Sequence, residues 1–577
     1  MPRLGRTLSL SAALLVFSWP PLLLVARGER PSYPLVTIVL ALLMVGIVIA
    51  WDQPSAGSAE AQPGDERASP GPSRRAWLQP RVIAVSIVVV TILLSSAHRW
   101  VVQIAWSPYV ADMLIVVREA ARRFLGGHDP YSTYRTYDAP WGMVLPYGPA
   151  LWLPFSVPVL LHTDLRVVTI VGEIFVPACC GLAAIVEAAR GRTASAVAWI
   201  ILVAAIVASV DLANFTVMGH TSVYWPLLPV FAVVVTRRRW LQAAFALGIL
   251  LLARTTMVTL VPVFVMAVWA DRRCGRRRTA AALAIVAATA LAGLLPFALW
   301  DFHAMWDGMI ASYPRIMKQV VWTSNDGGAT NTIGVTGWLL SHHREHLVEV
   351  VQAIVMAITY AAAWRAIARG ARPLPWMALA LLAFSMTTLW PVAYIYFDVL
   401  LLFVAAAMAD TLGRSRLTLG LAPWLLTLAG LIVVVATTLH LTTSALPAIA
   451  AGSSEGRRAF RLGFSSVERD GEREVAWVVG DRATVVFPRS SAAPADVIVA
   501  CQGRGAPGGP PPTVTAVLNG RMLGTAHTGG GWEALHFTVP KSAWWIGFNH
   551  LELQLSPPAE TGTFAVSDVR VVSRAAP

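Results

Sequence analysis

Residues 419–439, LGLAPWLLTLAGLIVVVATTL, contain no charged side chain. As an α-helix, a stretch of this length spans about 30 Å, the thickness of the hydrocarbon core of a bilayer. Apolar stretches of similar length recur at residues 34–51, 81–97 and 280–300. Their lengths predict helices that cross a membrane rather than helices of a soluble core.

The composition of the whole chain supports this prediction. Of the 577 residues, 56% are hydrophobic and 13% are charged, which is roughly half the charged fraction of an average soluble domain. A soluble globular protein is therefore excluded. The net charge of +13 does not indicate nucleic-acid binding, because the arginines form short clusters beside apolar segments, as the control of membrane topology requires.

The N-terminal segment resembles a signal peptide, but its sequence favours retention. Pro20 and Pro21 are followed by further apolar residues, and no small-residue cleavage site follows them. We expect residues 1–51 to form a transmembrane hairpin. The Pro/Gly/Ser/Glu-rich residues 52–80 are then a cytoplasmic linker.

Basic clusters between the apolar segments predict which ends face the cytoplasm. If each cluster lies inside, every interval between two clusters crosses the membrane an even number of times. The clusters are Arg3 with Arg6, Arg74, Arg75 and Arg81, Arg190 with Arg192, Arg237–Arg239, Arg272–Arg278, Arg365–Arg372, and Arg414 with Arg416.

This count predicts about 13 transmembrane helices in an all-α membrane domain, with the core domain at residues 81–444. Residues 149–161 are too short to cross, so we expect them to enter the membrane and return. The last span starts inside and places residues 445–577 outside the cell membrane. The predicted pairs of spans are 194–211 with 219–236, 280–299 with 347–364, and 376–392 with 395–410, and the predicted outside loops are 101–148, 211–220, 300–346 and a turn near Tyr394.

After about Phe464 the apolar runs become short and alternate with polar residues, which is typical of β-strands. Turn signals such as Asn519-Gly520 and Gly529–Gly531 separate them. We therefore predict an all-β sandwich of about 110 residues. The expected strands include Val475–Val479, Ala483–Phe487, Val497–Ala500, Val514–Leu518, Leu551–Leu555 and Val569–Val572.

The stretch VLNGRMLGTAHTGGGWEALHFTVPKSAWWIGFNHLELQLS resembles galactose-binding-like jelly rolls, in which an Asn-Gly hairpin, a Trp and a Gly-Phe-Asn turn recur. Trp532, Trp544 and Trp545 are candidates for stacking on sugar faces, and the alternative is that they fill the core or touch lipid. With Cys179 and Cys180 inside a helix and Cys501 the one thiol expected outside, no disulfide is predicted.

The first outside loop carries the most specific motif of the chain. Residues 109–155 read YVADMLIVVREAARRFLGGHDPYSTYRTYDAPWGMVLPYGPALWLPF, with Asp112 just beyond a span, an amphipathic helix, Gly-His-Asp-Pro-Tyr and Pro-Tyr-Gly-Pro. This order resembles the first extracytoplasmic loop of polyprenyl-phosphate-dependent glycosyltransferases of the GT-C superfamily, and most of all their bacterial mannosyltransferase branch. Tyr147-Gly148-Pro149 departs from the Tyr-Pro-Pro of that branch, which puts the subfamily and the sugar in doubt more than the fold.

Two weaker motifs extend the resemblance to roughly residues 81–440. Gly219-His220-Thr221-Ser222 is similar to a Gly-Gln-x-Asn of the family, and Ala253-Arg254-Thr255 is similar to its Lys-Pro. The resemblance implies an inverting transferase that moves mannose or arabinofuranose from a polyprenyl-phosphate donor to a cell-envelope glycan or glycolipid. The expected location is a multi-pass protein of the plasma membrane with its active site outside.

Transfer from a lipid phosphate needs a carboxylate that deprotonates the acceptor and a cation that holds the phosphate. Asp112 is the expected base, since a carboxylate so close to hydrocarbon is costly unless it is used or paired. Its structural alternative is a helix cap or a salt bridge to Arg118 or Arg122. Arg254, at the outer tip of a helical hairpin, is the expected phosphate ligand, and its alternative is a snorkelling interfacial arginine.

Further polar residues are weaker candidates. Arg315 and Lys318 are alternative phosphate ligands, and Asp138 is a weaker candidate for the catalytic carboxylate than Asp129. Asp129 has the alternative of shaping a turn, His220 of capping a helix, and Tyr394 and Tyr396 of belonging to an aromatic belt. The expected substrate-binding residues are His128, Asp129, Tyr131, Tyr147, His220, His303 and Tyr394.

No metal-ligand spacing or nucleotide-binding glycine loop is present in the sequence. No cofactor is therefore predicted with certainty, and a divalent metal, Mg²⁺ or Mn²⁺, recruited by Asp112 stays open. Membrane lipid is an expected partner and nucleic acid is not. Two other functions remain: a transporter or flippase for a lipid-linked glycan, and a non-catalytic protein of envelope glycan assembly.

Overall fold

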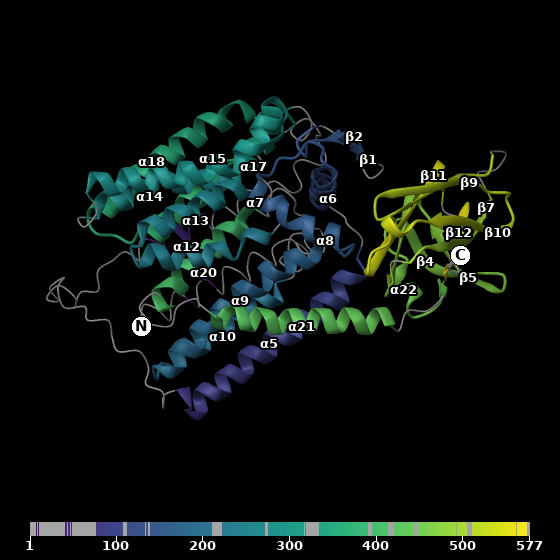
Figure 1. Cartoon of the computed structure of the whole chain (residues 1–577), viewed down its shortest axis with the longest axis horizontal. Coiled ribbons are helices and arrows are strands. Elements are labelled where there is room, and N and C mark those ends of the chain that lie inside the picture. Colours follow the sequence, from purple (N-terminus) through teal and green to yellow (C-terminus); the bar gives the residue numbers. More distant parts are fainter. Residues whose placement is uncertain are drawn as a thin grey trace.

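A helical region and a C-terminal β-sandwich make up the chain (Figure 1). The computed structural model describes a few single residues between 7 and 48 and then residues 77–107, 112–132, 134–136, 139–209, 222–271, 275–316, 318, 334–389, 395–412, 421–443, 448–491, 493–504, 510–560 and 562–573.

Among these residues, six helical segments are long and apolar enough to cross a membrane: Pro80–His98, Arg166–Ala189, Arg276–Ala311, Glu345–Ala368, Ile395–Leu412 and Pro423–Leu441. The α-helices of the helical region are α5 (Pro80–Ala105), α6 (Asp112–Leu125), α7 (Pro149–Trp152), α8 (Ser156–Leu160), α9 (Arg166–Ala189), α10 (Thr193–Ala208), α12 (Leu227–Thr236), α13 (Trp240–Ala253), α14 (Leu260–Ala270), α15 (Arg276–Trp306), α16 (Ser312–Ile316), α17 (Gly334–Ser341), α18 (Val348–Ala368), α19 (Pro373–Thr387), α20 (Ile395–Leu412) and α21 (Leu421–Thr443).

The count of about 13 spans is not confirmed, because many apolar segments form helices of only 10–17 residues. Helix α13 has 14 residues, so it is about 21 Å long, short of the hydrocarbon thickness. Three of these short apolar segments include a 3₁₀ segment: η2 (Leu153–Phe155), η3 (Ser222–Tyr224) and η4 (Thr255–Thr259). The π-helical η5 (Asp307–Ala311) follows α15 and η7 (Glu345–Leu347) precedes α18, in two of the longer segments.

The helices differ in how much of their surface other helices cover. The apolar windows of α9 and α20 are 83% and 100% buried, whereas those of α15, α18 and α21 are each 17% buried. Large apolar side chains such as Leu295, Ile358 and Ile432 are consequently exposed. An apolar surface of this extent suits contact with lipid.

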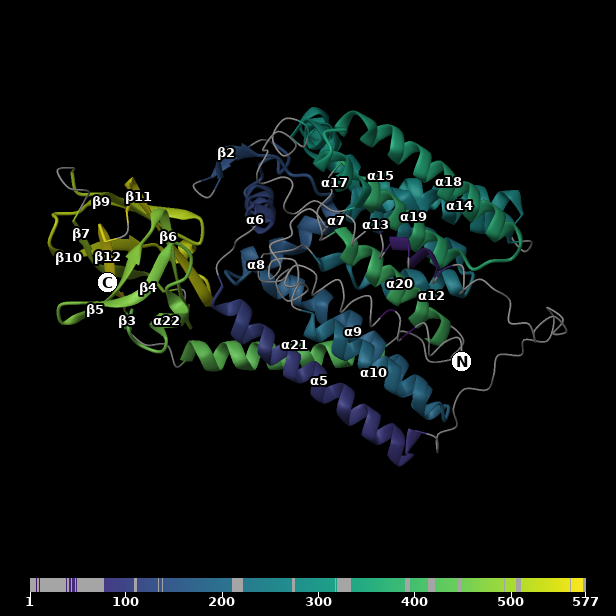
Figure 2. The ribbon, with the colours of Figure 1, turned by 180° about the vertical axis from the view of Figure 1, so that it is seen from behind.

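Ends that the topology prediction places on one side lie together. At one end of the bundle, Arg190 Nη1 donates to the carbonyl oxygen of Thr411 over 3.2 Å, and Arg372 pairs with Asp410 at 2.5 Å. At the other end, the C-termini of α5 and α21 meet the β-sandwich (Figures 1 and 2). Residues from several of the predicted inside ends therefore lie together at one end of the bundle, and which end faces the cytoplasm stays a prediction.

The C-terminal region consists of two antiparallel sheets around a common apolar core. One sheet has the order β10-β7-β12-β5-β4, with β3 paired to β12, and the other has the order β6-β11-β8-β9. The elements are β3 (Ala448–Ala450), α22 (Gly456–Ala459), β4 (Phe464–Asp470), β5 (Arg473–Val478), β6 (Gly480–Arg489), β7 (Ala495–Gly503), β8 (Thr513–Leu518), β9 (Arg521–His527), β10 (Trp532–Val539), η8 (Lys541–Ala543), β11 (Gly547–Ala559) and β12 (Phe564–Ser573).

Each of the six expected strands overlaps an observed strand, and only Val479 of the first lies beyond it, since β5 ends at Val478. The expected Asn519-Gly520 turn joins β8 to β9, with Leu518 opposite Arg521 and φ of 51° and 75° at the two turn residues. These positive φ values are those of a two-residue hairpin turn, which Asn-Gly favours.

The sandwich is docked on the helical region rather than tethered to it. The ring of Trp106, after α5, packs edge-on against Phe548 of β11 at 5.1 Å. Arg461 Nε donates to the carbonyl oxygen of Trp106 over 3.1 Å, and the sandwich core is continuous with side chains of α5, α9 and α21, among them Ile170 and Val434. The two regions therefore share one apolar core at their junction.

Candidate functional site

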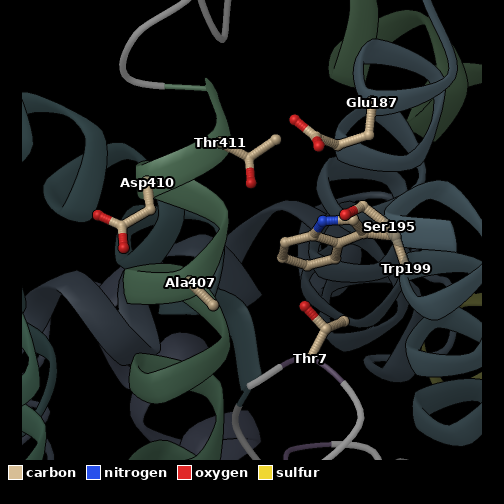
Figure 3. A pocket seen from close by; sticks show the side chains of 7 residues that line it. All are labelled: Thr7, Glu187, Ser195, Trp199, Ala407, Asp410 and Thr411. Atoms are coloured by element: carbon tan, nitrogen blue, oxygen red, sulfur yellow. The ribbon is translucent and has the colours of Figure 1, made fainter. Parts of the chain in front are cut away.

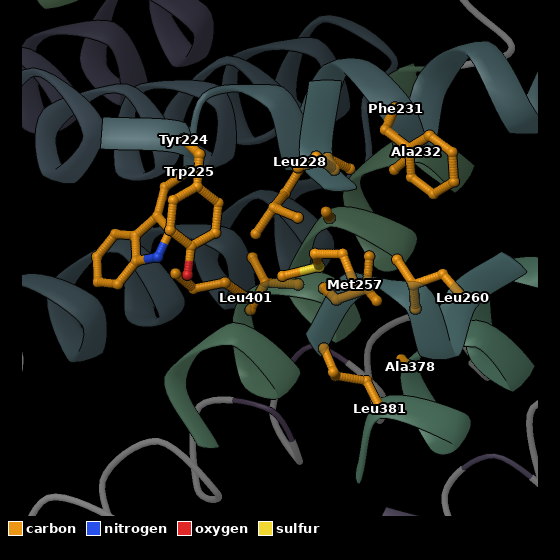
Figure 4. Close-up of a cluster of buried hydrophobic side chains, with 14 of the residues drawn as sticks. Tyr224, Trp225, Leu228, Phe231, Ala232, Met257, Leu260, Ala378, Leu381 and Leu401 are labelled. Carbon is orange, nitrogen blue, oxygen red and sulfur yellow. The ribbon is translucent and has the colours of Figure 1, made fainter. Parts of the chain in front are cut away.

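Three helical elements bring four polar side chains together inside the helical region. Arg254 ends α13, where φ of −139° and ψ of 124° stop the helix before η4. Tyr224 ends η3 and is followed by Trp225, while Asp398 lies in the first turn of α20. Figure 4 shows Tyr224 and Trp225 beside buried apolar side chains that include Met257 of η4 and Leu401 of α20. In the sequence, Arg254 comes three residues before Met257, and Asp398 three residues before Leu401.

The carboxylate of Asp398 is the centre of this cluster. It accepts hydrogen bonds from Tyr224 Oη at 2.5 Å and Trp225 Nε1 at 3.0 Å, and its Oδ2 lies 3.6 Å from Arg254 Nε. Arg254 Nε also donates to Tyr224 Oη over 3.1 Å. The side chains of Arg254 and Asp398 are only 12% and 3% exposed, so each charge is buried with an opposite charge beside it, as burial requires.

The first-loop motif Tyr147-Gly148-Pro149 lies directly against the end of α13. A β-carbon on Gly148 would overlap the carbonyl oxygen of Leu252, two residues before Arg254. The φ of −73° and ψ of 165° at Gly148 are open to proline and to most residues, so this position needs glycine for space. Gly148 therefore stands where the first loop contacts the backbone of α13, two residues before Arg254.

The Gly-His-Asp-Pro-Tyr motif of the same loop holds the Tyr147-Gly148-Pro149 motif in place. Asp129 Oδ1 accepts from the backbone N–H of Tyr131 over 3.0 Å, which forms a local turn. Tyr131 Oη donates to the carbonyl oxygen of Tyr147 over 3.0 Å and accepts from Trp152 Nε1 at 3.2 Å. Burial raises the pKa of Tyr131, so its hydroxyl remains a donor at physiological pH.

Glu173 of α9 is a further buried acid. It is 4% exposed and lies beside the Ser222 hydroxyl of η3. The preceding Gly172 packs so closely on η3 that a β-carbon there would overlap the carbonyl oxygen of Ser222, two residues before Tyr224. Because an ionisable residue inside an apolar span is costly, it indicates a functional or paired position.

The sequence analysis did not select Glu173, Asp398 or Tyr224. A signal for two of them was present, since Glu173 and Asp398 each interrupt an apolar run, TIVGEIFVP and YIYFDVLLL. Tyr224 had no such signal, because its role depends on η3 meeting α20.

The structure places the other candidates differently. Asp112 is the first residue of α6, but its side chain lies outside the described residues, as do Asp138, His220 and Tyr394. Three candidates of the 300–346 loop are exposed, and two of them pair locally: Arg315 with Asp307 at 3.1 Å and Lys318 with Glu349 at 2.5 Å. His303 is exposed, as is His128, and Tyr396 is buried. Tyr131 and Tyr147 are thus brought together, in the loop that contacts Leu252 two residues before Arg254, whereas Arg315 and Lys318 pair with other residues.

The three tryptophans of the sandwich have different surroundings. Trp544 is fully buried with the Arg489 guanidinium 3.8 Å from its ring centre, so no face is open to a sugar. Trp545 is 5% exposed and faces the junction with the helical region. Trp532 is half-buried, and the Arg473 guanidinium lies 4.7 Å from its ring centre.

No protein-family model matches the sequence, and no curated protein matches it. One solved structure is similar, described as a family 35 carbohydrate binding module from an environmental isolate; it is 16% identical and covers 23% of this chain and 100% of its own, with a TM-score of 0.16. At this TM-score the similarity carries no argument about the present chain.

Within the described part of the chain, no three His, Cys, Asp or Glu side chains form a group that could hold a metal ion. A small cavity at the opposite end of the bundle lies between Thr7, Glu187, Trp199 and Asp410 (Figure 3). Its acids are engaged, since Glu187 pairs with Arg190 at 2.8 Å and Asp410 with Arg372, so this cavity belongs to the packing of the predicted cytoplasmic ends.

Proposed function

We propose that the chain is an integral membrane glycosyltransferase that moves a sugar from a polyprenyl-phosphate donor to a cell-envelope glycan or glycolipid. The proposed sugar is mannose or arabinofuranose, transferred with inversion, and the proposed active face is the end of the bundle that carries the sandwich.

The observation that carries the proposal is the contact between Gly148 and Leu252, which puts the first-loop motif beside the buried Arg254. A guanidinium has five N–H donors in a planar fork that suits the oxygens of a phosphate. Asp398 neutralises Arg254 while no donor is bound. A phosphate that exchanges for part of this pairing would be held between the first loop and the tip of the α13–η4 hairpin.

Asp112 is the proposed general base. It begins α6, the amphipathic helix that packs against α7 and α8, and α7 starts at Pro149 of the first-loop motif. The base and the cation would then approach the same motif from two sides. A carboxylate that takes the acceptor proton accelerates transfer by about a hundredfold or more.

The sandwich is proposed to be a jelly roll that holds carbohydrate near this site. Trp532 is the proposed sugar contact, because its ring is more accessible than those of Trp544 and Trp545. A divalent metal at Asp112 remains part of the proposal as an alternative to metal-free transfer. Neither point is needed for the assignment of the donor.

A transporter of lipid-linked glycans is the second candidate, and the burial of Glu173 and Asp398 favours it. Ionisable residues inside spans are typical of transport pathways and proton relays. The two candidates differ in products, because a transporter moves the lipid-linked glycan unchanged and a transferase leaves a polyprenyl phosphate behind.

The test is incubation of the purified full-length protein in proteoliposomes with radiolabelled polyprenyl-phosphate mannose or arabinofuranose and an envelope glycan acceptor. Labelled glycan in the wild type, and at least a hundredfold slower formation with Asp112→Asn, is the expected result. Donor binding should survive in Asp112→Asn, because that variant keeps the size and polarity of the side chain. Labelled donor moved across the bilayer without a labelled product would select the transporter instead.

A further inference from the structure

A cavity of about 180 Å³ lies at the junction of the helical region and the sandwich. The helical region contributes Arg118 and Arg122 of α6, and His162 and Thr163 from the connection between α8 and α9. The sandwich contributes Ser542 and Trp545 from the segment between β10 and β11. The cavity is thus completed only where the two regions meet.

Backbone contacts fix the walls of this cavity. Ile546 donates its N–H to the carbonyl oxygen of His162 over 2.7 Å, and Thr163 forms a parallel β-bridge with Ile546. His162 has a φ of 50°, the left-handed conformation of a helix C-cap, and the N–H of Thr163 donates back to the carbonyl oxygen of Pro158 over 2.9 Å. The connection is therefore held by the end of α8 on one side and by the sandwich on the other.

The ring of Trp545 is also held in place. The side chain of Asn549 accepts a hydrogen bond from the backbone N–H of Trp545 over 2.8 Å and donates one to the backbone carbonyl oxygen of Trp545 over 3.0 Å. The Trp545 ring packs edge-on against His550 at 5.8 Å. A wall that is already ordered costs little entropy when a ligand binds.

The charge in the cavity is of one sign. Two arginines line it, and none of the described lining residues is acidic. Asp164, between the lining residues Thr163 and Leu165, is paired with Arg166, whose Nη2 lies 2.6 Å from Asp164 Oδ2. The Ser542 hydroxyl accepts a hydrogen bond from Arg521, which adds a third guanidinium behind the wall.

The size and chemistry of the cavity define the ligand. A cavity of about 150 Å³ holds a benzene-sized molecule, so this one has room for a single ring. Arginines bind carboxylate and phosphate groups with charge-assisted hydrogen bonds, and the aromatic face of Trp545 suits the C–H face of a sugar. We propose that this cavity binds one sugar ring that carries an anionic group, either a phosphate or a carboxylate.

This binding does not depend on the proposed transferase activity, and it is measured without turnover. The full-length protein in detergent micelles is titrated with a hexose 1-phosphate, glucuronic acid, inorganic phosphate and a neutral hexose, and binding is followed by isothermal titration calorimetry. We expect the hexose phosphate, the uronic acid or both to bind, and the neutral hexose and inorganic phosphate to bind at least about tenfold more weakly. Equal binding of all four probes, or no binding of the two charged sugars, overturns the proposal.

Variants locate the binding. Arg122→Gln should raise the Kd for the charged sugar about tenfold, whereas Lys541→Gln, which removes the same charge from the exposed residue beside Ser542, should leave it unchanged. Because Arg122 Nη2 also donates to the carbonyl oxygen of Asn519 over 3.0 Å, limited proteolysis must show that the sandwich remains docked. Ser542→Phe keeps both arginines and fills the cavity, so it should abolish binding; retained binding in this variant overturns the site.

Discussion

Gly148 and Leu252 touch through their backbones, and no side chain fits between them. One belongs to the first loop and the other to the last turn of α13, so their contact fixes the distance from the Tyr147-Gly148-Pro149 motif to Arg254. The geometry of the proposed donor site therefore depends on a position where a methyl group is already too large.

Gly148→Ala should lower both stability and activity. The added methyl group must push α7 away from α13, and overpacking of this kind costs about 1–3 kcal/mol. Thermal unfolding of the purified protein measures the stability, and the glycan assay measures the activity. Gly531→Ala is the control, because a β-carbon at Gly531 meets nothing within 4 Å; equal effects of the two variants would contradict the role of the contact.

Arg254 and Asp398 should show strong coupling in stability. Either Arg254→Gln or Asp398→Asn leaves one buried charge without its partner, which costs about 3–5 kcal/mol. The double variant should recover much of this loss, since no buried charge remains. Unfolding in denaturant for the four proteins of the cycle gives the coupling energy.

The same double variant separates structure from function. If Arg254 holds the donor phosphate, the double variant should be stable and still bind donor at least tenfold more weakly than the wild type. A double variant with wild-type donor affinity would show that the pair serves only the packing of α13 and α20.

Docking of the sandwich should depend on pH through Asp164. Although burial by itself raises the pKa of Asp164, the Arg166 guanidinium holds it below the usual value of 3.8. Because the pKa is lower in the folded state, the stabilisation is fully present above about pH 4 and is lost as the pH falls through the folded value. His550 also faces this pair, with its Nε2 3.3 Å from Arg166 Nη2, so it must be varied separately.

Asp164→Asn should therefore increase cleavage between the two regions at pH 7 and make little difference near pH 2. Limited proteolysis across this range, with His550→Gln measured in parallel, checks the prediction. The control is Asp481→Asn, which removes an exposed carboxylate at the sandwich surface. A pH-independent difference between wild type and Asp164→Asn would contradict the assignment.

The topology prediction is tested with reporter fusions. A reporter placed after residue 445 should be active only outside the cytoplasm, and one placed within residues 52–80 only inside it. A cytoplasmic signal from the tail would invert the face on which Asp112 and Arg254 are proposed to act.

Local signals predicted the parts of this fold that are decided locally. Apolar length identified α5 and α21. Asn519-Gly520 identified the β8–β9 hairpin, because few residues other than Asn and Gly readily adopt the positive φ values of a two-residue turn. Length alone does not identify α13 and α14, since Arg254 stops one helix and η4 begins the next, which divides the predicted hairpin into short helices.

The polar cluster could be predicted only in part. Arg254 was selected from its place at a hairpin tip, but its partner Asp398 lies 144 positions further along the chain, from 254 to 398, and no local pattern links them. The docked sandwich was equally hidden: the role of Trp545 follows from Ile546 pairing with the His162–Thr163 connection, which depends on tertiary packing and not on strand propensity.

The hydrogen bond from Arg122 to Asn519 also has a consequence for biosynthesis. The two residues are 397 positions apart, so at about 5–20 residues per second the ribosome needs roughly 20–80 s to make the second after the first. During that interval α6 has its arginines in place but no sandwich to receive them. A nascent chain of this protein thus emerges with the proposed catalytic helix exposed, and a domain synthesised much later completes it.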